Sequence, residues 1–310
     1  MKRFLVAIVV LGVMGLAVFY GLTIPGVVTK AELPKHTASI QNGETMFYAG
    51  GCASCHAAPA SDKCDDHKYS EPTKLVGGRC LKTPFGTFYV PNISPDKEDG
   101  IGGWTNAEFV TAMVKGVSPS GSHYYPAFPF TSYQRMKYTD LIDMKAYLDS
   151  LPAVKGKAPA HDLALPFKLR RGLGLWKVLF LDGKQFKADP GASDEINRGA
   201  YLTEGPGHCG ECHSPRNALG GVDTARRFGG GAAPEGGGFI PNITSHKTGI
   251  GGWSKDELVE AFTTGFTPSF DSLGGSMTSV WKNLSKLSVE DRKAIAAYLK
   301  SLPPVESKKK

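Results

Sequence analysis

The order of apolar and polar residues along the chain predicts a mainly helical protein. An uncharged apolar run occupies residues 4–22. Further along, apolar residues recur every three to four positions in four segments, a period typical of helices that bury one face. These segments are residues 106–115, 139–151, 254–264 and 288–302. The second and fourth segments both end in Tyr-Leu-x-Ser-Leu-Pro, where the proline stops the helix.

The apolar run at residues 4–22 is long enough to cross a membrane. Its nineteen residues would rise about 28 Å as a helix, close to the thickness of the hydrocarbon core. Lys2 and Arg3 precede the run, and positive charges stay on the cytoplasmic side, so the rest of the chain is expected outside. A cleaved signal peptide is the alternative, although residues 20–25 offer no small-x-small cleavage site. We expect an N-terminal anchor at residues 1–30 in the inner (cytoplasmic) membrane, and both interpretations place the body in the periplasm.

The remainder of the chain contains an internal repeat, in which the same motifs recur in the same order. The recurring pairs are Cys-x-x-Cys-His at 52–56 and 209–213, Pro-Asn-Ile at 91–93 and 241–243, and Gly-Ile-Gly-Gly-Trp at 100–104 and 249–253. Each tryptophan is followed by one of the predicted amphipathic helices, and each half closes with another. The two halves are therefore expected to share one fold.

Each half carries the attachment motif of a covalent haem. The residues are Cys52, Cys55 and His56 in the first half, and Cys209, Cys212 and His213 in the second. Two thiols three positions apart on a helical turn reach the two vinyl groups of one porphyrin, and the adjacent histidine ligates the iron. A zinc site would need a second pair of ligands in each half, and a redox dithiol needs no histidine. We expect two covalently bound haem c groups, with His56 and His213 as proximal ligands.

Together, the repeat and the haem motifs predict the fold class: two tandem class I cytochrome c-like domains with long loops. We place these haem domains, both expected in the periplasm, at residues 36–152 and 195–304, with a linker at 153–194. The 38 glycines and 21 prolines agree with long ordered loops. An apolar piece of the linker, residues 173–181, is too short to cross a membrane and is expected to pack between the domains.

Length and charge set further limits. The 310 residues are enough for two cores, and 41% hydrophobic and 21% charged residues are ordinary for a globular protein. The formal charge is +7, of which three charges lie in a basic tail at residues 305–310 that we expect to be solvated. The basic residues are scattered and form no reading motif, so nucleic acid is not an expected partner.

Two cysteines remain outside the haem motifs. Cys64 and Cys80 both lie in the first half. An oxidising compartment and an even remainder favour a disulfide, which would close a loop of about 15 residues and stabilise the fold by roughly 3 kcal/mol in the chain-entropy model. A thiolate bound to an iron is the alternative.

The sixth ligand of each iron decides whether the haem only carries electrons. In the second half, Met277 follows Gly274-Gly275-Ser276, and a loop methionine suits a distal ligand that closes the iron and raises its potential. In the first half, the matching position is Phe128, which cannot bind iron. Met136 is the favoured replacement, His123 is the alternative, and an open five-coordinate iron is the third possibility.

Four further residues are candidates for contact with the haem propionates. Trp104, Trp253, Asn92 and Asn242 carry N–H donors suited to a carboxylate and belong to the repeated motifs. The alternative is that they fix the turns and fill the core.

The sequence resembles the cytochrome c subunits of periplasmic, membrane-bound alcohol, gluconate and fructose dehydrogenases. The resemblance covers nearly everything after the anchor. It rests on the repeated motifs, on Gly-Val-Ser-Pro at 116–119, on Tyr-Pro-Ala at 125–127, and on the linker segments 165–167 and 172–176. It implies a carrier that accepts electrons from a periplasmic dehydrogenase and passes them to quinone, a soluble cytochrome or a terminal oxidase of the respiratory chain.

Two departures from that family bear on function. Its members usually carry three haem domains, whereas this chain has two, and their first domain usually has methionine where Phe128 stands. The alternative function is therefore a two-haem redox enzyme, of the peroxidase or thiosulfate dehydrogenase type, with the first haem as the reactive centre. No cluster of acid–base residues surrounds that haem in the sequence, so an electron carrier, not an enzyme, is favoured.

Overall fold

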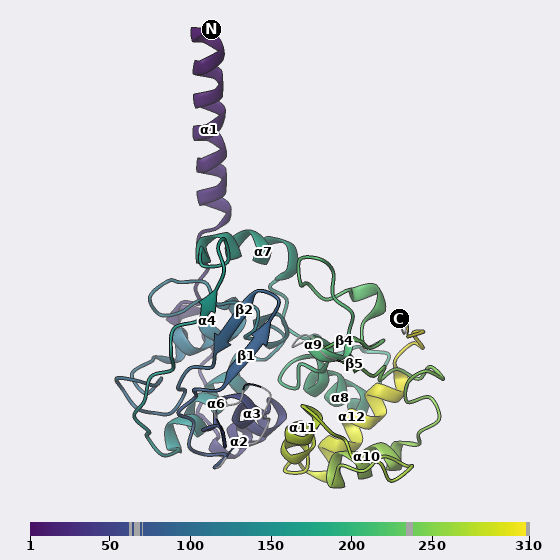
Figure 1. The fold of residues 1–310 in the computed structure, drawn as a ribbon. Coiled ribbons are helices and arrows are strands. Elements are labelled where there is room, and N and C mark those ends of the chain that lie inside the picture. Colours follow the sequence, from purple (N-terminus) through teal and green to yellow (C-terminus); the bar gives the residue numbers. More distant parts are fainter. Residues whose placement is uncertain (62–63, 65–68, 70, 234–237, 308–310) are drawn as a thin grey trace.

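The computed structural model describes the chain except for residues 62–63, 65–68, 70, 234–237 and 308–310. The end of the predicted basic tail thus lies outside the described residues. The described part is mainly helical (Figure 1). Its α-helices are α1 (Lys2–Leu22), α2 (Ile40–Ala49), α3 (Cys52–His56), α4 (Asn106–Lys115), α5 (Phe130–Tyr133), α6 (Tyr138–Ser150), α7 (Leu173–Phe180), α8 (Asp194–Glu204), α9 (Cys209–His213), α10 (Lys255–Thr264), α11 (Met277–Leu284) and α12 (Val289–Ser301). Three single turns of 3₁₀-helix lie at Lys30–Glu32, Arg170–Gly172 and Thr224–Arg226.

Helix α1 projects away from the rest of the molecule (Figure 1). None of its residues is buried, and its only charged residues are Lys2 and Arg3 at its start. Among the described helices it alone is long and apolar enough to cross a membrane. By length and composition it fits a membrane anchor and also a signal peptide.

The part of the chain from α2 to α6 is called the first lobe here, and in it α2 and α6 cross closely. Gly43 lies at the crossing, where a Cβ atom would stand 2.1 Å from the backbone oxygen of Asp143. Only glycine lets the two backbones approach this far. The helix predicted at 106–115 is α4, and the one predicted at 139–151 is α6, shifted by one residue.

The part of the chain from α8 to α12, called the second lobe, has the same crossing. There α8 meets α12 at Gly199, where a Cβ atom would stand 1.9 Å from the backbone oxygen of Ala294. The helices predicted at 254–264 and 288–302 are α10, one residue shorter at its start, and α12, one residue shorter at each end. The sequence repeat therefore corresponds to repeated helix packing.

Helices α4 and α10 begin and end in the same way. Thr105 and Ser254 cap their N-termini, and each exchanges hydrogen bonds with a glutamate three residues on, Glu108 or Glu257. Both helices end at a glycine in the left-handed conformation, with φ of 58° at Gly116 and 79° at Gly265. These local signals explain why both helices could be predicted almost residue by residue.

The strands are short. A hairpin of β1 (Cys80–Thr83) and β2 (Gly86–Tyr89) is extended by β3 (Asp162–Leu163) from the linker, all antiparallel. A second antiparallel pair joins β4 (Gly231–Ala232) and β5 (Phe239–Ile240). The linker is thus attached to the first lobe by backbone hydrogen bonds. Cys64 and Cys80 form a disulfide with an S–S distance of 1.94 Å, which is the expected pairing.

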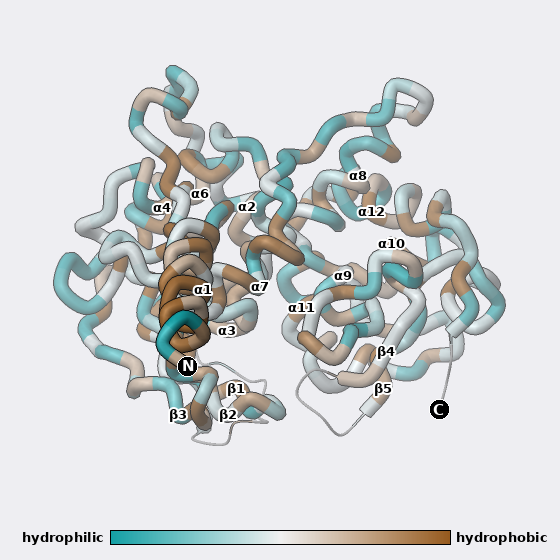
Figure 2. Tube along the Cα trace, turned by 90° about the horizontal axis from the view of Figure 1, so that it is seen from above, coloured by the Kyte–Doolittle hydropathy of each residue, from teal (hydrophilic) through white to brown (hydrophobic). Residues whose placement is uncertain are grey.

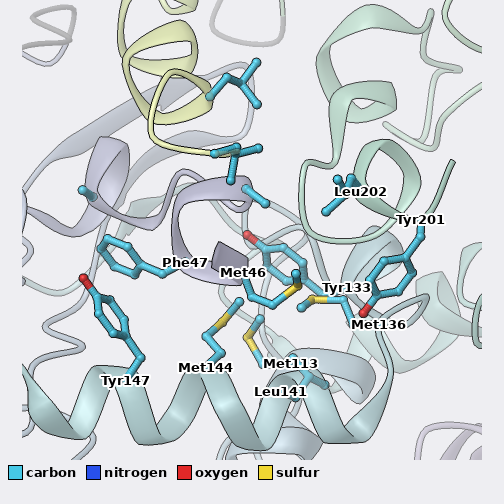
Figure 3. Packing of buried hydrophobic residues seen from close by; sticks show 14 of the residues in the cluster. Met46, Phe47, Met113, Tyr133, Met136, Leu141, Met144, Tyr147, Tyr201 and Leu202 are labelled. Atoms are coloured by element: carbon cyan, nitrogen blue, oxygen red, sulfur yellow. The ribbon is translucent and has the colours of Figure 1, made fainter. Parts of the chain in front are cut away.

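One apolar core extends through both lobes. Figure 3 shows Met46, Tyr133 and Met136 of the first lobe packed toward Tyr201 and Leu202 of the second. Met136 and Leu202 expose 0% and 1% of their surface. The lobes are therefore held together by buried side chains as well as by the linker.

Helix α7 lies where α1 meets the two lobes. The indole N–H of Trp176 donates to the backbone oxygen of Leu219 in the second lobe, at 2.9 Å. The ammonium of Lys177 donates to the backbone oxygen of Gly116 in the first lobe, at 2.6 Å. Helix α7 thus contacts both lobes, although part of its apolar surface is exposed. Figure 2 shows it as an apolar stretch beside α1.

Candidate haem-binding sites

The first Cys-x-x-Cys-His motif forms the short helix α3. Gly51, which precedes it, has φ of 56°, and this left-handed residue turns the chain from α2 directly into α3. Burial raises the pKa of the Cys52 thiol to about 12. Neither Cys52 nor Cys55 forms a disulfide within the described residues.

The histidine of each motif is oriented by a backbone carbonyl. Nδ1 of His56 lies 2.8 Å from the oxygen of Pro91, and Nδ1 of His213 lies 2.8 Å from the oxygen of Pro241. A carbonyl only accepts, so Nδ1 carries the proton and Nε2 keeps the lone pair that binds a metal. Both prolines belong to the repeated Pro-Asn-Ile motif, which explains why that motif recurs with the haem motif.

Burial keeps these imidazoles neutral. It lowers the pKa of His56 to about 4 and outweighs the hydrogen bond to Pro91, which raises the pKa. Burial likewise lowers the pKa of His213. A neutral ring with a free lone pair is the form that ligates iron.

The second motif forms α9 and is entered by a similar turn. His208 precedes it, with φ of 39°, where the first lobe has Gly51. The residues at both sites thus fit a covalent haem, since each offers two thiols on one helical turn and a histidine with its lone pair on Nε2. A haem so bound supplies an iron that exchanges one electron.

The two attachment turns touch each other. Nε2 of His208 lies 3.3 Å from the backbone oxygen of Gly50, so the residues just before the two motifs are in contact. On either side, Asn283 donates to the hydroxyl of Ser54 at 3.0 Å, and Ser132 donates to the carboxylate of Glu211 at 2.9 Å. The two haem positions are therefore neighbours across the lobe boundary.

This contact is self-complementary. Ser54 and Glu211 occupy the same position in the two motifs, just before the second cysteine, and Ser132 and Asn283 are related by the same 151-residue offset as Met136 and Leu287. Each motif thus contacts the equivalent segment of the other lobe, which is the pattern of a twofold interface.

Comparison with known proteins agrees with this geometry. The cytochrome c family model matches residues 40–152. A relative from Cereibacter sphaeroides, described as a diheme cytochrome c-type protein, is 50% identical over 270 residues, which is 87% of this chain and 88% of the relative. The chain belongs to the diheme c-type cytochromes. This diheme cytochrome binds two haem c groups covalently, as its two motifs predict.

The resemblance to dehydrogenase subunits is also confirmed. The fructose dehydrogenase cytochrome subunit of Gluconobacter japonicus is 34% identical over 271 residues. The cytochrome c subunit of alcohol dehydrogenase (quinone) from Gluconobacter oxydans is 35% identical over 276 residues. Each match covers 86% of the diheme cytochrome but only 53% and 55% of these subunits, so the diheme cytochrome spans about half their length.

A buried carboxylate supports the second attachment turn. Glu211 accepts hydrogen bonds from Thr131 at 2.7 Å and Arg216 at 2.8 Å, in addition to Ser132. Burial raises its pKa, but the charge of Arg216 and these hydrogen bonds lower it by more, so the carboxylate is ionised at neutral pH. Sequence reasoning missed Glu211, because the variable positions of the motif carry no signal of their own.

On the distal side of the second haem, Met277 lies where a glycine-rich loop becomes a helix. It is half-buried and is the first residue of α11, rather than a residue within the loop as predicted. The matching Phe128 lies in an aromatic cluster, with ring centroids 5.7 Å from Tyr124 and 5.4 Å from Tyr133. The first lobe thus places apolar rings where the second places a thioether.

Met136, the predicted sixth ligand of the first haem, is packed into the core of the structure. Its side chain is completely buried, and its Cγ lies 3.5 Å from the point where a Cβ on Gly205 would stand. Leu287, the equivalent residue of the second lobe, is buried in the same core just before the last helix. An apolar residue before an N-cap commonly fixes the entry of the helix.

His123, the alternative ligand, is engaged at both ring nitrogens. Nε2 donates to the backbone oxygen of Thr23 at 3.0 Å, and Nδ1 accepts from Lys177 at 3.0 Å. Ligation by His123 would break both contacts. Ligation of the first iron by Met136 or His123 would therefore require these contacts to change, and the sixth ligand of the first haem stays a prediction.

The asparagines expected at the propionates have other partners. Both amide hydrogens of Asn92 are accepted by backbone oxygens of the linker, Val154 at 2.7 Å and Gly156 at 3.0 Å. Asn242 donates to Val305 at 2.6 Å and Thr248 at 3.1 Å. The amide hydrogens of Asn92 and Asn242 are thus bonded to protein acceptors. Through these bonds the two residues fix the segment that follows the last helix of each lobe.

The tryptophans of the repeated motifs lie beside the core. Trp104 and Trp253 are both half-buried and pack against the buried cluster. Their indole N–H groups remain candidates for a contact with the haem propionates.

Proposed function

We propose that this diheme cytochrome is an electron carrier, not an enzyme, held at the periplasmic face of the inner membrane by α1. Electrons enter from a periplasmic dehydrogenase and leave to quinone, a soluble cytochrome or a terminal oxidase. The dehydrogenase subunits among its relatives support this assignment. The two lobes then act as tandem class I cytochrome c domains, with boundaries at 36–152 and 195–304.

The observation that carries the proposal is the contact between the two haem-attachment turns. Hydrogen bonds from His208 to Gly50 and from Asn283 to Ser54 connect them directly. Two haems attached to touching turns are close enough for electrons to pass between them without a further carrier. The side chains that hold this contact, Glu211 and Ser132 among them, thereby set the geometry of the relay.

In this proposal the ligands of each iron are held in place by the protein in both oxidation states. The Pro91 and Pro241 carbonyls orient the proximal histidines. Met277 is the proposed sixth ligand of the second haem, and Trp104 and Trp253 are proposed donors to the propionates. His213 is buried, which limits reorganisation on the proximal side of the second haem when the charge on iron changes.

The test uses inner-membrane vesicles from cells that make either the full chain or a variant without the second haem, C209A/C212A. Ethanol, fructose and gluconate are added separately, and the reduced haem absorbance is followed in time. We expect one of these donors to reduce both haems of the full chain, with reoxidation in air. The variant should show about half the haem signal and impaired reoxidation, since one of its two carriers is missing.

A carrier role is contradicted if no donor reduces the haems and the purified protein instead turns over hydrogen peroxide or thiosulfate. That result would favour the two-haem redox enzyme, with the first haem as the reactive centre.

A further inference from the structure

The end of α1 is fixed to the lobes and is not a free tether. Thr23 is completely buried, and its backbone oxygen accepts from His123. Arg171 donates to the Thr23 hydroxyl at 2.8 Å and to the backbone oxygen of Tyr20 at 2.9 Å, and its guanidinium lies 4.3 Å from the centre of the Tyr20 ring. The direction in which α1 leaves the molecule is therefore set by side chains of the linker.

Helix α7 crosses directly beside this junction. A Cβ on Gly174 would stand 2.6 Å from Cβ of Thr23, so the two segments are in close contact. Figure 1 shows α7 lying across the foot of α1, at the end of the lobes from which α1 projects. In a membrane that α1 spans, α7 is thus at the level of the bilayer surface.

In helix α7 the apolar side chains face outward and a lysine is buried, whereas a surface helix usually buries its apolar face. Gly174 and Lys177 are buried against the lobes, whereas Leu175, Val178 and Leu179 expose 40%, 58% and 64% of their surface. These three leucine and valine residues are spaced three and four apart and share one face of the helix. The outward face of α7 is therefore apolar, although it faces solvent in the isolated molecule.

Neighbouring segments extend this apolar surface. Phe85 and Phe167 lie edge to face with ring centroids 5.1 Å apart, and Trp176 of α7 donates to the backbone of Leu219. The foot patch consists of Phe85, Leu165, Phe167, Leu169, Leu175, Val178, Leu179 and Leu219, each at least 37% exposed. Apolar surface gathered in this way marks an interaction site.

We propose that the foot patch inserts into the interfacial layer of the bilayer that α1 spans. This inference rests on the proposed anchor. It commits to lipid because the patch is continuous with the end of α1 and lies across its foot, so the acyl chains around α1 are the nearest apolar phase. Lys168 lies between Phe167 and Leu169 of the foot patch and is exposed. A cation at this place is expected of a surface that meets anionic headgroups.

Insertion would fix the orientation of the haem lobes on the membrane. A single helix allows rotation and tilt of whatever it carries, whereas a helix plus a lateral patch gives two points of attachment. The face of each lobe that meets a donor or acceptor would then be constant. The foot patch thereby deepens the proposed function without altering the haem relay.

The test measures immersion depth with spin labels on the full, haem-loaded chain in lipid nanodiscs. The six cysteines are taken up by the thioethers and by the Cys64–Cys80 disulfide, so an introduced cysteine supplies the free thiol for labelling. Three variants are compared, L179C in the foot patch, V9C in α1 and F270C, whose side chain is 87% exposed in the second lobe. Accessibility to oxygen and to a water-soluble nickel chelate is recorded for each, with amphipol in place of lipid as the reference.

We expect the oxygen-to-nickel ratio at L179C to rise in nanodiscs toward the value at V9C, while F270C stays at the aqueous value in both. The inference is overturned if V9C is immersed and L179C remains aqueous. If L179C is aqueous in nanodiscs but protected in native membranes, the patch binds a protein instead, which also overturns it. If V9C itself is aqueous, the anchor fails, so the two failures are distinguishable.

Discussion

At the scale of single residues, the proximal sides of the two haems are alike and the distal sides are not. His56 and His213 each direct Nδ1 at a proline carbonyl of the Pro-Asn-Ile motif. On the opposite side, the second lobe has Met277 where the first has Phe128. The difference between the haems therefore arises from one distal position rather than from their attachment.

The first prediction concerns this distal position. Replacing Phe128 with methionine should add a second thioether-ligated iron, because Met277 holds the matching place in the repeat. The oxidised F128M variant should then show a stronger methionine-to-iron band in the far red, and excess cyanide should bind it less readily than the unmodified protein.

Two variants serve as controls for this prediction. M136L should leave the far-red band unchanged, since Met136 fills the core at the position of Leu287. M277L should abolish the band. Loss of part of the band in M136L would show that Met136 is the sixth ligand of the first haem.

The second prediction concerns Asp143, which is buried and joins α6 to the segment before α2. Burial raises its pKa, but hydrogen bonds from the Ser39 N–H at 2.7 Å, Asn42 at 2.7 Å and His36 at 2.6 Å lower it by more, to below 3.8. A lowered pKa contributes stability that is present above the unfolded-state pKa and is lost as the pH falls through the folded-state pKa.

The variant D143N should therefore lower the free energy of unfolding by about 1–3 kcal/mol at pH 7. Its deficit relative to the unmodified protein should shrink as the pH falls from the unfolded-state pKa of Asp143 through its lowered folded-state pKa, because the native carboxylate is then protonated as well. Urea unfolding followed by circular dichroism measures both. The exposed Asp162 gives a matched control in D162N, and an equal loss in the two variants would contradict the role of Asp143.

At the scale of elements, each lobe is closed by one helix crossing, and both crossings depend on a glycine. Gly43 and Gly199 are separated from the facing backbone by less than a side chain needs. The sequence places each of these glycines inside a helix, where glycine is unfavourable, and the close crossing explains why glycine stands there.

The third prediction follows from these crossings. In G43A and G199A the added methyl would meet a backbone oxygen, which cannot rotate away, so the helices must separate. We expect each variant to lose about 1–3 kcal/mol of stability or more, measured by urea unfolding of the haem-loaded protein. G172A is the matched control, because Gly172 is helical and a Cβ there would contact nothing within 4 Å. A similar loss in G172A would show that the effect is not one of packing.

Elements with local end signals were predictable, and those set by distant contacts were not. The boundaries of α4 and α10 follow from Thr105, Ser254 and their capping glutamates. Helix α11 was missed because Met277 was expected in a loop, and its packing partner Gly265, against which Trp281 lies, is distant in sequence. The same limit applies to Asn92, whose acceptors belong to the linker.

At the scale of the whole molecule, the decisive feature is the contact between the lobes. Glu211 and Ser132 form one half of it, and Ser54 and Asn283 form the other. Sequence alone identified the repeat and both haem motifs. It could not show that the motifs face each other, because that depends on the polar side chains at their variable positions.

The fourth prediction tests whether these pairs couple the lobes. A double-mutant cycle of S132A and E211Q, scored by urea unfolding, should give an interaction energy of about 0.5–3 kcal/mol, since the two side chains share a buried hydrogen bond. The cycle of S54A and N283A should give a value of the same sign. Interaction energies near zero in both cycles would mean that apolar packing alone joins the lobes.

The contact between the two halves is twofold, and this bears on how the sequences of the halves can diverge in evolution. Residue i of one half meets residue j of the other, and j meets i, as in an isologous homodimer. The chain is in effect such a dimer whose subunits have been joined end to end. Covalent joining frees each half to vary alone, so one copy can keep Met277 while the other carries Phe128. A true homodimer, with one gene for both sites, could never hold two different irons.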